Sequence, residues 1–486
     1  MEYHLSKTQK VLPTVDIISQ ARISLISTLP QKGKGTEAAI QHIRNELAPA
    51  FNAASQSPNY YGFVTGGVTR AAALSDNLVT EYDQNLSVHL PKETISTEVE
   101  AAALKMLCHL LRLDTNDWKH RIFTTGATAS NILGLACGRE YVIRKRGLNH
   151  GHGEVSVGKL GLIRAMNEAG ISSIRILSSM AHSSLLKAAS LVGLGRDAVV
   201  DIGKKDSPVK LDLDRLEEQL KESEYGHIVV VSCGEVNTGR FATNGEEMKH
   251  IRELCDKYDG WIHIDGAFGI MARMLLTPET SQQYSRIVSA VEYVELADSI
   301  TGDGHKLLNV PYDCGFFFSR DPSDAINVFQ NAGAAYLNSG QTGDYIISPL
   351  NIGIENSRRF RALPVYATLI AYGEEGYKDM MKRQIDLARS IAKVILDHPA
   401  YELLPENQGD NLDETFMVVL FRALDELLNA TLVRLINETG KIYVSGTQWD
   451  GQPAARFAIS NWQVDVARDV VLVKQVLDEV SQRNVK

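Results

Sequence analysis

The feature that most constrains the fold is an alternation of short apolar segments with amphipathic ones, which runs from about residue 95 to about residue 350. The segments "HIVVVSCG" and "WIHID" are short and continuously apolar, like strands that are buried on both faces of a parallel sheet. Between them, "NGEEMKHIRELCDKY" has its apolar residues at helical spacing. Repeated strand–helix units predict an α/β fold, with a mostly parallel central sheet covered by helices.

The two ends of the chain have a different character. A long helical segment follows residue 350, and "FMVVLFRA", "IYVSGTQW" and "ARFAISN" then alternate like strands with one solvated face. The first residues form helical pieces and an aromatic, turn-rich connector, "SPNYYGFVTGG". We therefore expect an N-terminal helical segment at 1–70, a large domain at 71–345 and a smaller C-terminal α+β domain at 346–486.

Composition and charge exclude several classes of function. The net charge of −9 gives no electrostatic footprint for nucleic acid or for an anionic membrane surface. No apolar stretch is long enough to span a bilayer, and the start lacks the apolar core of a secretion signal. The five cysteines are scattered and never spaced as CxxC, which favours a reducing, cytoplasmic location. No metal-binding or dinucleotide motif occurs, and the near P-loop "GEVSVGKL" has Leu160 where a hydroxyl belongs.

Two charged residues stand where an apolar environment is expected. Lys306, in "TGDGHKLLNVPYDCG", opens an apolar run, and such a pocket favours the neutral, nucleophilic form of an amine. Asp265 ends the strand "WIHID", where a buried carboxylate is costly unless it meets a cation. Each residue alone has an ordinary alternative, a solvated lysine and a helix or turn cap. Together they suggest pyridoxal phosphate, with Lys306 holding the aldehyde as a Schiff base and Asp265 keeping the pyridine nitrogen protonated.

Two strand–helix junctions add candidates for the same ligand. In "TTGATAS" small residues open a helix, so that backbone N–H groups and the hydroxyls of Thr128 and Ser130 can meet a phosphate. In "MAHSSLL", His182 is placed to stack its ring on a pyridine, although a lone histidine is more often structural.

These segments resemble the group II pyridoxal-phosphate-dependent decarboxylases over nearly the whole chain. The resemblance rests on six ordered motifs: "GATASN", "AHSSLLKAASLVGLG", "NTGRF", "WIHIDGAFG", "DGHKLLNVPYDCG" and "SRRFRAL". It implies an aspartate-aminotransferase-like fold (fold type I). It also implies a homodimer in which the N-terminal segment packs on the partner and the active site lies at the subunit interface.

The resemblance also assigns roles at matching positions. It makes Lys306 the Schiff-base lysine, Asp265 the partner of the pyridine nitrogen, and Tyr336 the residue that protonates the substrate carbon after carbon dioxide leaves. Relatives that form an aldehyde instead have phenylalanine at the last position, so Tyr336 favours plain decarboxylation. The other residues implied to contact the cofactor are His182 and Ala267 on the two faces of the ring, Ala127, Thr128 and His305 near the phosphate, and Thr238.

Substrate-binding residues are less constrained. Phe63, Val64 and Thr65 of the connector are candidates, as is one arginine of "SRRFR", for which we select Arg358. The arginines of that motif have an alternative role in pairing with acidic groups at the domain boundary. The motif D-G-H-K replaces the usual N-x-P-H-K, and "VNTG" replaces T-T-x-T-G, so the substrate does not carry over and Asp303 has no inherited role.

The expected activity is conversion of an L-amino acid to its amine and carbon dioxide. The alternatives on the same scaffold are aldehyde formation, transamination and carbon–carbon bond formation. A non-catalytic protein that keeps the fold is a further alternative, which the presence of Lys306, Asp265, His182 and Tyr336 disfavours.

Overall fold

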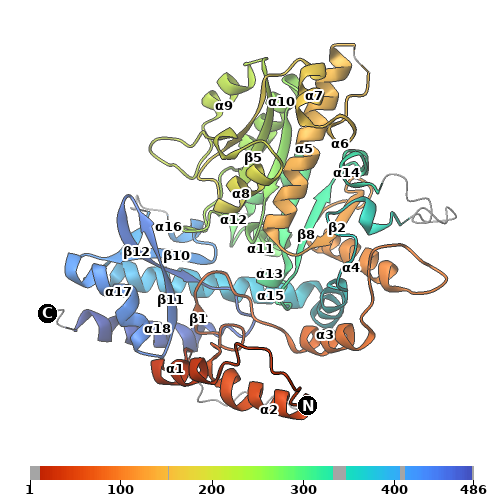
Figure 1. Ribbon diagram of the computed structural model, residues 1–486. Helices are drawn as coiled ribbons and strands as arrows, with labels where there is room; N and C mark the ends of the chain where they lie inside the picture. The colour runs from red at the N-terminus through yellow and green to blue at the C-terminus, as the bar shows by residue number, and fades with distance from the viewer. Residues whose placement is uncertain (1–10, 152, 332–345, 406–410, 484–486) are drawn as a thin grey trace.

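The computed structural model describes residues 11–151, 153–331, 346–405 and 411–483. Its larger part is built on a seven-stranded sheet with the strand order β2-β8-β7-β6-β5-β3-β4 (Figure 1). The five adjacent strands β4, β3, β5, β6 and β7 are all parallel to their neighbours in this order, and β8 is antiparallel to both β7 and β2. This confirms a mostly parallel sheet. The strands are β2 (His120–Thr124), β3 (Ser173–Ser178), β4 (Val199–Asp201), β5 (Tyr225–Ser232), β6 (Trp261–Asp265), β7 (Ser299–Asp303) and β8 (Gly315–Ser319).

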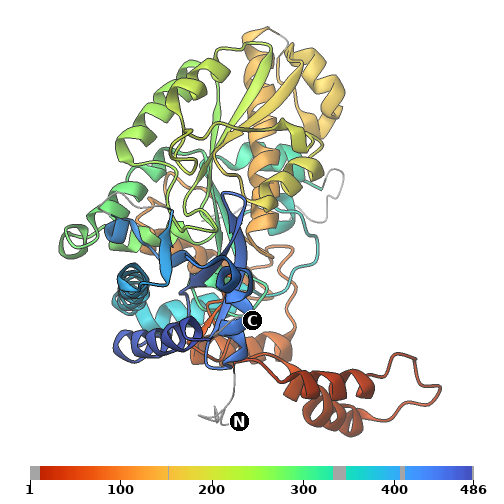
Figure 2. The same cartoon turned by 90° about the vertical axis from the view of Figure 1, so that its left-hand side faces the viewer.

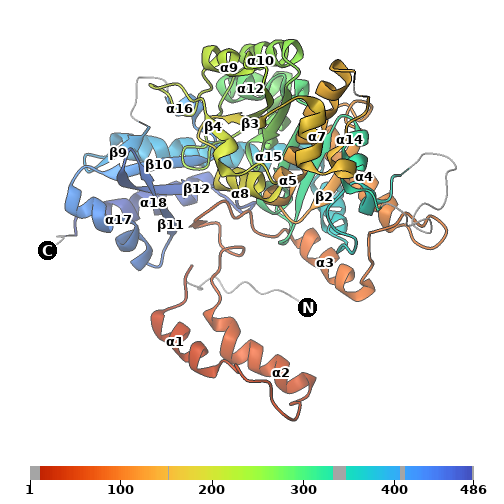
Figure 3. The same ribbon diagram turned by 45° about the horizontal axis from the view of Figure 1, so that its top comes forward.

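Helices cover both faces of this sheet, as the strand–helix alternation predicts (Figure 3). One face carries α5 (Ala127–Asn149) with α7 (Leu162–Ala169), α8 (Ser183–Leu191) and α14 (Pro322–Phe329). The other carries α9 (Leu213–Leu220), α10 (Gly245–Lys257) and α12 (Ser285–Val291). The remaining helices of this part are α3 (Arg70–Tyr82), α4 (Ser96–Leu110), α6 (Val157–Leu160), α11 (Pro278–Ser281) and α13 (Gly304–Leu307).

The register of the parallel strands brings four polar side chains to one edge of the sheet. Ser232 at the end of β5 pairs with Asp265 at the end of β6, and Asp265 pairs with Thr301, two residues before the end of β7 at Asp303. The carboxyl ends of parallel strands are where open α/β sheets bind ligands. The fold therefore places Asp265 and Asp303 side by side at a binding edge.

The smaller part is a five-stranded sheet with the order β1-β11-β12-β10-β9, covered by helices, which agrees with the expected α+β character. Its first strand comes from the N-terminal connector and pairs in parallel with β11. The boundaries expected near residues 70 and 345 stay predictions. The elements are β1 (Tyr60–Tyr61), α15 (Ala362–Asp397), β9 (Tyr401–Leu404), α16 (Asn411–Glu414), β10 (Val418–Ala423), α17 (Glu426–Glu438), β11 (Tyr443–Trp449), β12 (Gln452–Ala458) and α18 (Val466–Ser481).

The N-terminal helices α1 (Val15–Ser24) and α2 (Thr36–His42) stand apart from both sheets (Figures 2 and 3). Apolar side chains of this segment are unusually exposed: Ile23 on α1 is 86% accessible, and Leu29, between α1 and α2, is 93% accessible. No helix among the described residues is apolar over a length that could cross a membrane.

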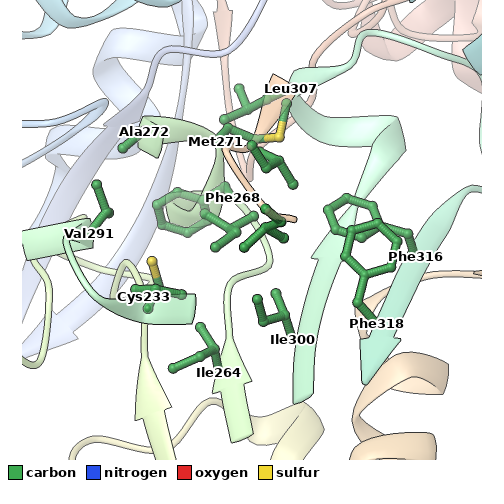
Figure 4. Packing of buried hydrophobic residues seen from close by; sticks show 14 of the residues in the cluster. Cys233, Ile264, Phe268, Met271, Ala272, Val291, Ile300, Leu307, Phe316 and Phe318 are labelled. Atoms are coloured by element: carbon green, nitrogen blue, oxygen red, sulfur yellow. The ribbon is translucent and has the colours of Figure 1, made fainter. Parts of the chain in front are cut away.

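An apolar core lies directly beneath the binding edge of the large sheet (Figure 4). Ile264 and Ile300, the residues on β6 and β7 next to the polar strand ends, are both fully buried in it, and Phe268 covers them. Fully burying side chains of this size contributes about 1.5–3 kcal/mol each. The strand ends that carry Asp265 and Asp303 are thus held on a rigid, tightly packed base.

Candidate active site

A cavity of about 410 Å³ opens at the carboxyl ends of β5, β6 and β7. Its walls come from segments far apart in the chain: the N-terminal connector, the start of α5, the loop before α8, the strand ends and β12 of the smaller sheet. The predicted site residues that line it are Phe63, Ala127, Thr128, His182, Asp265, Ala267, His305 and Lys306, and Val64 lines it as well.

Lys306 lies in the one-turn helix α13, directly after β7. Its Nζ is 2.9 Å from Asp303 Oδ2 and 5.8 Å from the centre of the Phe268 ring, and its side chain is 20% exposed. The connector crosses close above it at Gly66, where a Cβ would come within 1.6 Å of the Lys306 carbonyl oxygen. Only glycine permits this approach, and Phe63 and Val64 of the same connector line the cavity.

Asp265 ends β6 and is 9% exposed. Its Oδ2 accepts a hydrogen bond from Asn131 Nδ2 at 3.1 Å, and within the described ranges no cationic side chain lies at ion-pair distance from it. A buried carboxylate with only a neutral donor is unfavourable unless a cation completes the site. Asp265 therefore has the environment that a protonated ligand nitrogen requires.

A chain of neutral donors leads to this carboxylate. Trp261 Nε1 donates to Ser299 Oγ at 3.0 Å, and the Ser299 hydroxyl lies 2.8 Å from His263 Nδ1. His263 Nε2 is 3.0 Å from Asn131 Oδ1, and the amide of Asn131 donates to Asp265. Burial lowers the pKa of His263 to about 4, so the ring is neutral at physiological pH. Because Asn131 Nδ2 donates to Asp265, Asn131 Oδ1 is the atom that faces His263, and as an acceptor it places the ring's proton on Nε2. Every donor in the chain then points toward Asp265.

His182 caps α8 at the rim of the cavity. Its Nδ1 accepts a hydrogen bond from the backbone N–H of Ser184 at 3.2 Å and is 2.8 Å from the Ser184 hydroxyl. These contacts fix the ring at its Nδ1 side while the side chain lines the cavity. Its stacking role stays a prediction.

The opposite end of the cavity is the start of α5. Ala127 is the first residue of this 23-residue helix, and its N–H donates to Asp303 Oδ1 at 2.6 Å. The N-terminus of a long helix is an anion site, and Thr128 lines it as the motif predicted. His305 Nε2 is 3.7 Å from Asp303 Oδ1, and burial lowers the pKa of His305 although Asp303 opposes this shift.

Three of the predicted residues, Arg358, Thr65 and Thr238, do not line the cavity. Arg358 is 4% exposed and pairs with Glu100 at 2.8 and 3.1 Å, with further bonds to two backbone carbonyls, so the substrate role expected for it is corrected to a structural ion pair. The Thr65 hydroxyl bonds to the Gly62 carbonyl. Thr238 bonds to Glu235. Tyr336 falls at residues 332–345, outside the described residues.

The cavity is also lined by residues that no sequence motif predicted, and Arg456 is the most informative of them. It lies on β12, is 6% exposed, donates through Nη1 to the Val236 carbonyl, and keeps a buried Nε without a partner in the described chain. The sequence feature that could have indicated Arg456 is its position as a charged residue within the otherwise apolar strand "ARFAISN". Asn131 and His263 lie behind Asp265 and do not line the cavity, and in the sequence they are polar residues within a predicted helix and a predicted strand.

The residues present fit pyridoxal phosphate. Lys306 offers an amine, Asp265 an otherwise unneutralised carboxylate, and the start of α5 an anion site, all facing one cavity. When it is bound, this group supplies an electron-withdrawing ring that is attached to the protein through a lysine.

Three comparisons with known proteins agree with this geometry. Residues 20–422 match the family described as "Pyridoxal-dependent decarboxylase conserved domain". An L-2,4-diaminobutyrate decarboxylase of Acinetobacter baumannii is 30% identical over 65% of this chain and 58% of its own length. Tyrosine decarboxylase 4 of Petroselinum crispum is 25% identical over 91% of this chain and 83% of its own length.

Among solved structures, the 4-hydroxyphenylacetaldehyde synthase of Rhodiola rosea superimposes with a TM-score of 0.78. The match covers 99% of this chain and 94% of that one at 20% identity, so it establishes the fold. Because the family match spans most of the sequence and the cavity has the groups that its cofactor needs, the chain belongs to the pyridoxal-dependent decarboxylase family.

Proposed function

We propose that this protein decarboxylates an L-amino acid to its amine and carbon dioxide, with pyridoxal phosphate held by Lys306. The observation that carries the proposal is the pair of groups facing one cavity: the amine of Lys306, and Asp265, a buried carboxylate whose recorded hydrogen bond comes from a neutral amide. The family match supports the cofactor, and the relatives named as decarboxylases support the reaction class.

Each residue then has a defined task. Asp265 holds the proton on the ring nitrogen, and Asn131 orients the carboxylate for it. His182 and Ala267 both line the cavity, and we expect them to contact the two faces of the ring. The first amides of α5, with Thr128 and His305, surround the phosphate end.

Arg456 is the candidate for orienting the substrate. The bond that breaks at the α-carbon is the one held perpendicular to the ring, so positioning selects the reaction. A guanidinium on the cavity wall with an unpartnered, buried Nε suits a substrate carboxylate. We expect Arg456→Met to raise KM for the amino acid while the cofactor stays bound.

The test is a screen of the cofactor-loaded protein against all common L-amino acids, with amine and carbon dioxide measured together. Carbon dioxide with a stoichiometric amine supports the proposal. Aldehyde or hydrogen peroxide supports the second candidate, aldehyde formation, which the likeness to an aldehyde synthase keeps open. Bound cofactor with no carbon dioxide from any amino acid would falsify decarboxylation. Transamination or carbon–carbon bond formation would then be tested next, and a protein that binds no cofactor would be non-catalytic.

We also propose that the protein is a homodimer whose active site is completed by the partner, with the N-terminal helices packed on the second copy. Exposed apolar side chains of this N-terminal segment, such as Val15 on α1 (77%) and Leu29 between α1 and α2 (93%), support this arrangement because such a surface is costly in water. Sedimentation of Ile23→Asp/Leu29→Asp is expected to give monomer, whereas Leu427→Asp, at another exposed leucine on α17, leaves the dimer intact. The five cysteines, all free and buried, suit the cytoplasmic location we propose.

A further inference from the structure

Asp303 is a buried carboxylate shared by two partners. Its side chain is 5% exposed, Oδ2 is 2.9 Å from Lys306 Nζ, and Oδ1 accepts the first N–H of α5, from Ala127, at 2.6 Å. One carboxylate thus neutralises the catalytic lysine and caps the helix that faces the phosphate end. In this arrangement the anion site of α5 already contains an anion.

The position of Asp303 is fixed by its backbone. It ends β7, pairs with Gly315 of β8, and donates its N–H to the Ala267 carbonyl at 3.2 Å. The carboxyl group therefore cannot move far from the start of α5. A phosphate that binds there brings a second anion to the same amide, and two anions at that distance are strongly unfavourable unless one of them takes a proton.

The groups that face Asp303 come from every neighbouring element. Lys306 and His305 lie on α13, and the backbone N–H of Ala127 comes from α5. The buried Cys314 thiol precedes β8, and burial raises its pKa. Asp265 lines the same cavity from β6. When Lys306 gives up its charge to bind the cofactor, Asp303 loses its nearest cation while the phosphate adds negative charge.

Building on the proposed function, we propose that Asp303 accepts the proton of Lys306 as the cofactor binds and then remains a neutral acid beside the phosphate. The ammonium of Lys306 passes one proton to Asp303 Oδ2, and the neutral amine adds to the aldehyde carbon. The two protons left on nitrogen leave with the aldehyde oxygen as water, so no other reactant is needed. As a neutral acid, the carboxyl no longer repels an anion at the start of α5, and its Oδ2 hydroxyl is available as a hydrogen-bond donor to the phosphate.

The test compares cofactor binding to cofactor-free wild-type protein and to Asp303→Asn. The amide cannot take a proton, so Asp303→Asn should release the Lys306 proton to solution while the wild type keeps it on Asp303. The two proteins should therefore differ by one proton per bound pyridoxal phosphate, measured by calorimetry in buffers of different ionisation enthalpy. From about pH 6.5 to 8.5, wild-type affinity should fall relative to the variant by up to about tenfold per pH unit. Pyridoxal, which has no phosphate, should show neither difference.

The matched control is Asp313→Asn, the same charge change ten residues along the chain at an exposed acid that pairs with Arg361. Its proton exchange on cofactor binding and its pH profile should match those of the wild type.

Equal proton exchange and parallel pH profiles for wild type and Asp303→Asn would overturn the role of Asp303 and leave the proposed function intact. Failure of every protein, wild type included, to bind pyridoxal phosphate would overturn the proposed function itself. If Asp303→Asn does not fold, the wild type alone decides: release of about one proton fewer with pyridoxal phosphate than with pyridoxal supports the inference, and equal release with both contradicts it.

Discussion

Two buried carboxylates face the same cavity from neighbouring strand ends, and their surroundings make them opposites. Asp265 accepts from the neutral amide of Asn131 and has no cation at ion-pair distance among the described residues. Asp303 is already neutralised by Lys306 and by the start of α5. The first is therefore ready for a cationic ligand atom, while the second has to change its charge before an anion can bind beside it. The same residue type, at the same edge of one sheet, is suited to two different tasks by its partners alone.

The largest loss of activity is expected from a change at Lys306, which lies in the cavity between the Asp265 end and the Asp303 end, where the phosphate is expected. Lys306→Ala should abolish the absorbance band of the bound cofactor and lower kcat/KM by more than about a thousandfold, because no other amine of the described cavity wall can replace it. Lys187→Ala, an exposed lysine on α8, is the control and should leave both unchanged. Retention of the band in Lys306→Ala would remove the basis for calling this lysine the cofactor's attachment point.

Asp265→Asn and Asp303→Asn test the comparison directly, because the same substitution should have opposite effects on cofactor affinity. At Asp265 it removes the anion that stabilises a protonated ring nitrogen, so we expect weaker binding and a loss of about a hundredfold or more in kcat/KM. At Asp303 it removes an anion from the phosphate end, so binding should be retained or tightened. Cofactor titration followed by absorbance measures both, and a loss of affinity in both variants would show that the two ends are not distinct.

The sequence predicted one end of this cavity better than the other. Asp265 and Lys306 were predictable because each breaks a local apolar pattern, at a strand end and before "LLNVP". Asp303 could be singled out in the sequence but not given a role. Its hydrogen-bond partner Ala127 is 176 residues away in the chain, and the contact depends on how α5 meets β7. Arg358 was misassigned because a buried ion pair and a substrate-binding arginine look alike in sequence, and only the position of Glu100 separates them.

The next effect concerns the neutral donors behind Asp265. Asn131→Ala removes the recorded hydrogen bond to Asp265 Oδ2 and should lower activity about 10- to 100-fold, the usual range for residues that orient a functional group. Asn131→Asp should be worse at neutral pH and recover at lower pH, because it places a second carboxylate against Asp265. A purely structural role would not produce that pH-dependent recovery. Asn149→Ala, at the exposed end of α5, is the control, and equal pH profiles for Asn131→Ala and Asn131→Asp would count against the orienting role.

The smallest expected effect is on the free energy of unfolding in mild acid. It distinguishes His263, which supports the Asp265 end of the cavity, from buried histidines elsewhere in the sheet. Burial lowers the pKa of His120, His227 and His263 to about 4 each, so the unfolded chain takes up protons that the folded chain refuses. Their contribution to stability is complete above about pH 6.5 and is lost as the pH falls toward 4, by less than about 1 kcal/mol per histidine between pH 7 and 6.

His227→Leu should reduce this acid sensitivity, measured by denaturant unfolding at about pH 7 and about pH 6, without changing cofactor binding. His263→Leu should reduce it too but also weaken cofactor binding, because His263 alone of the three supports Asn131. Unchanged cofactor binding in His263→Leu would show that Asp265 is oriented without this chain of donors.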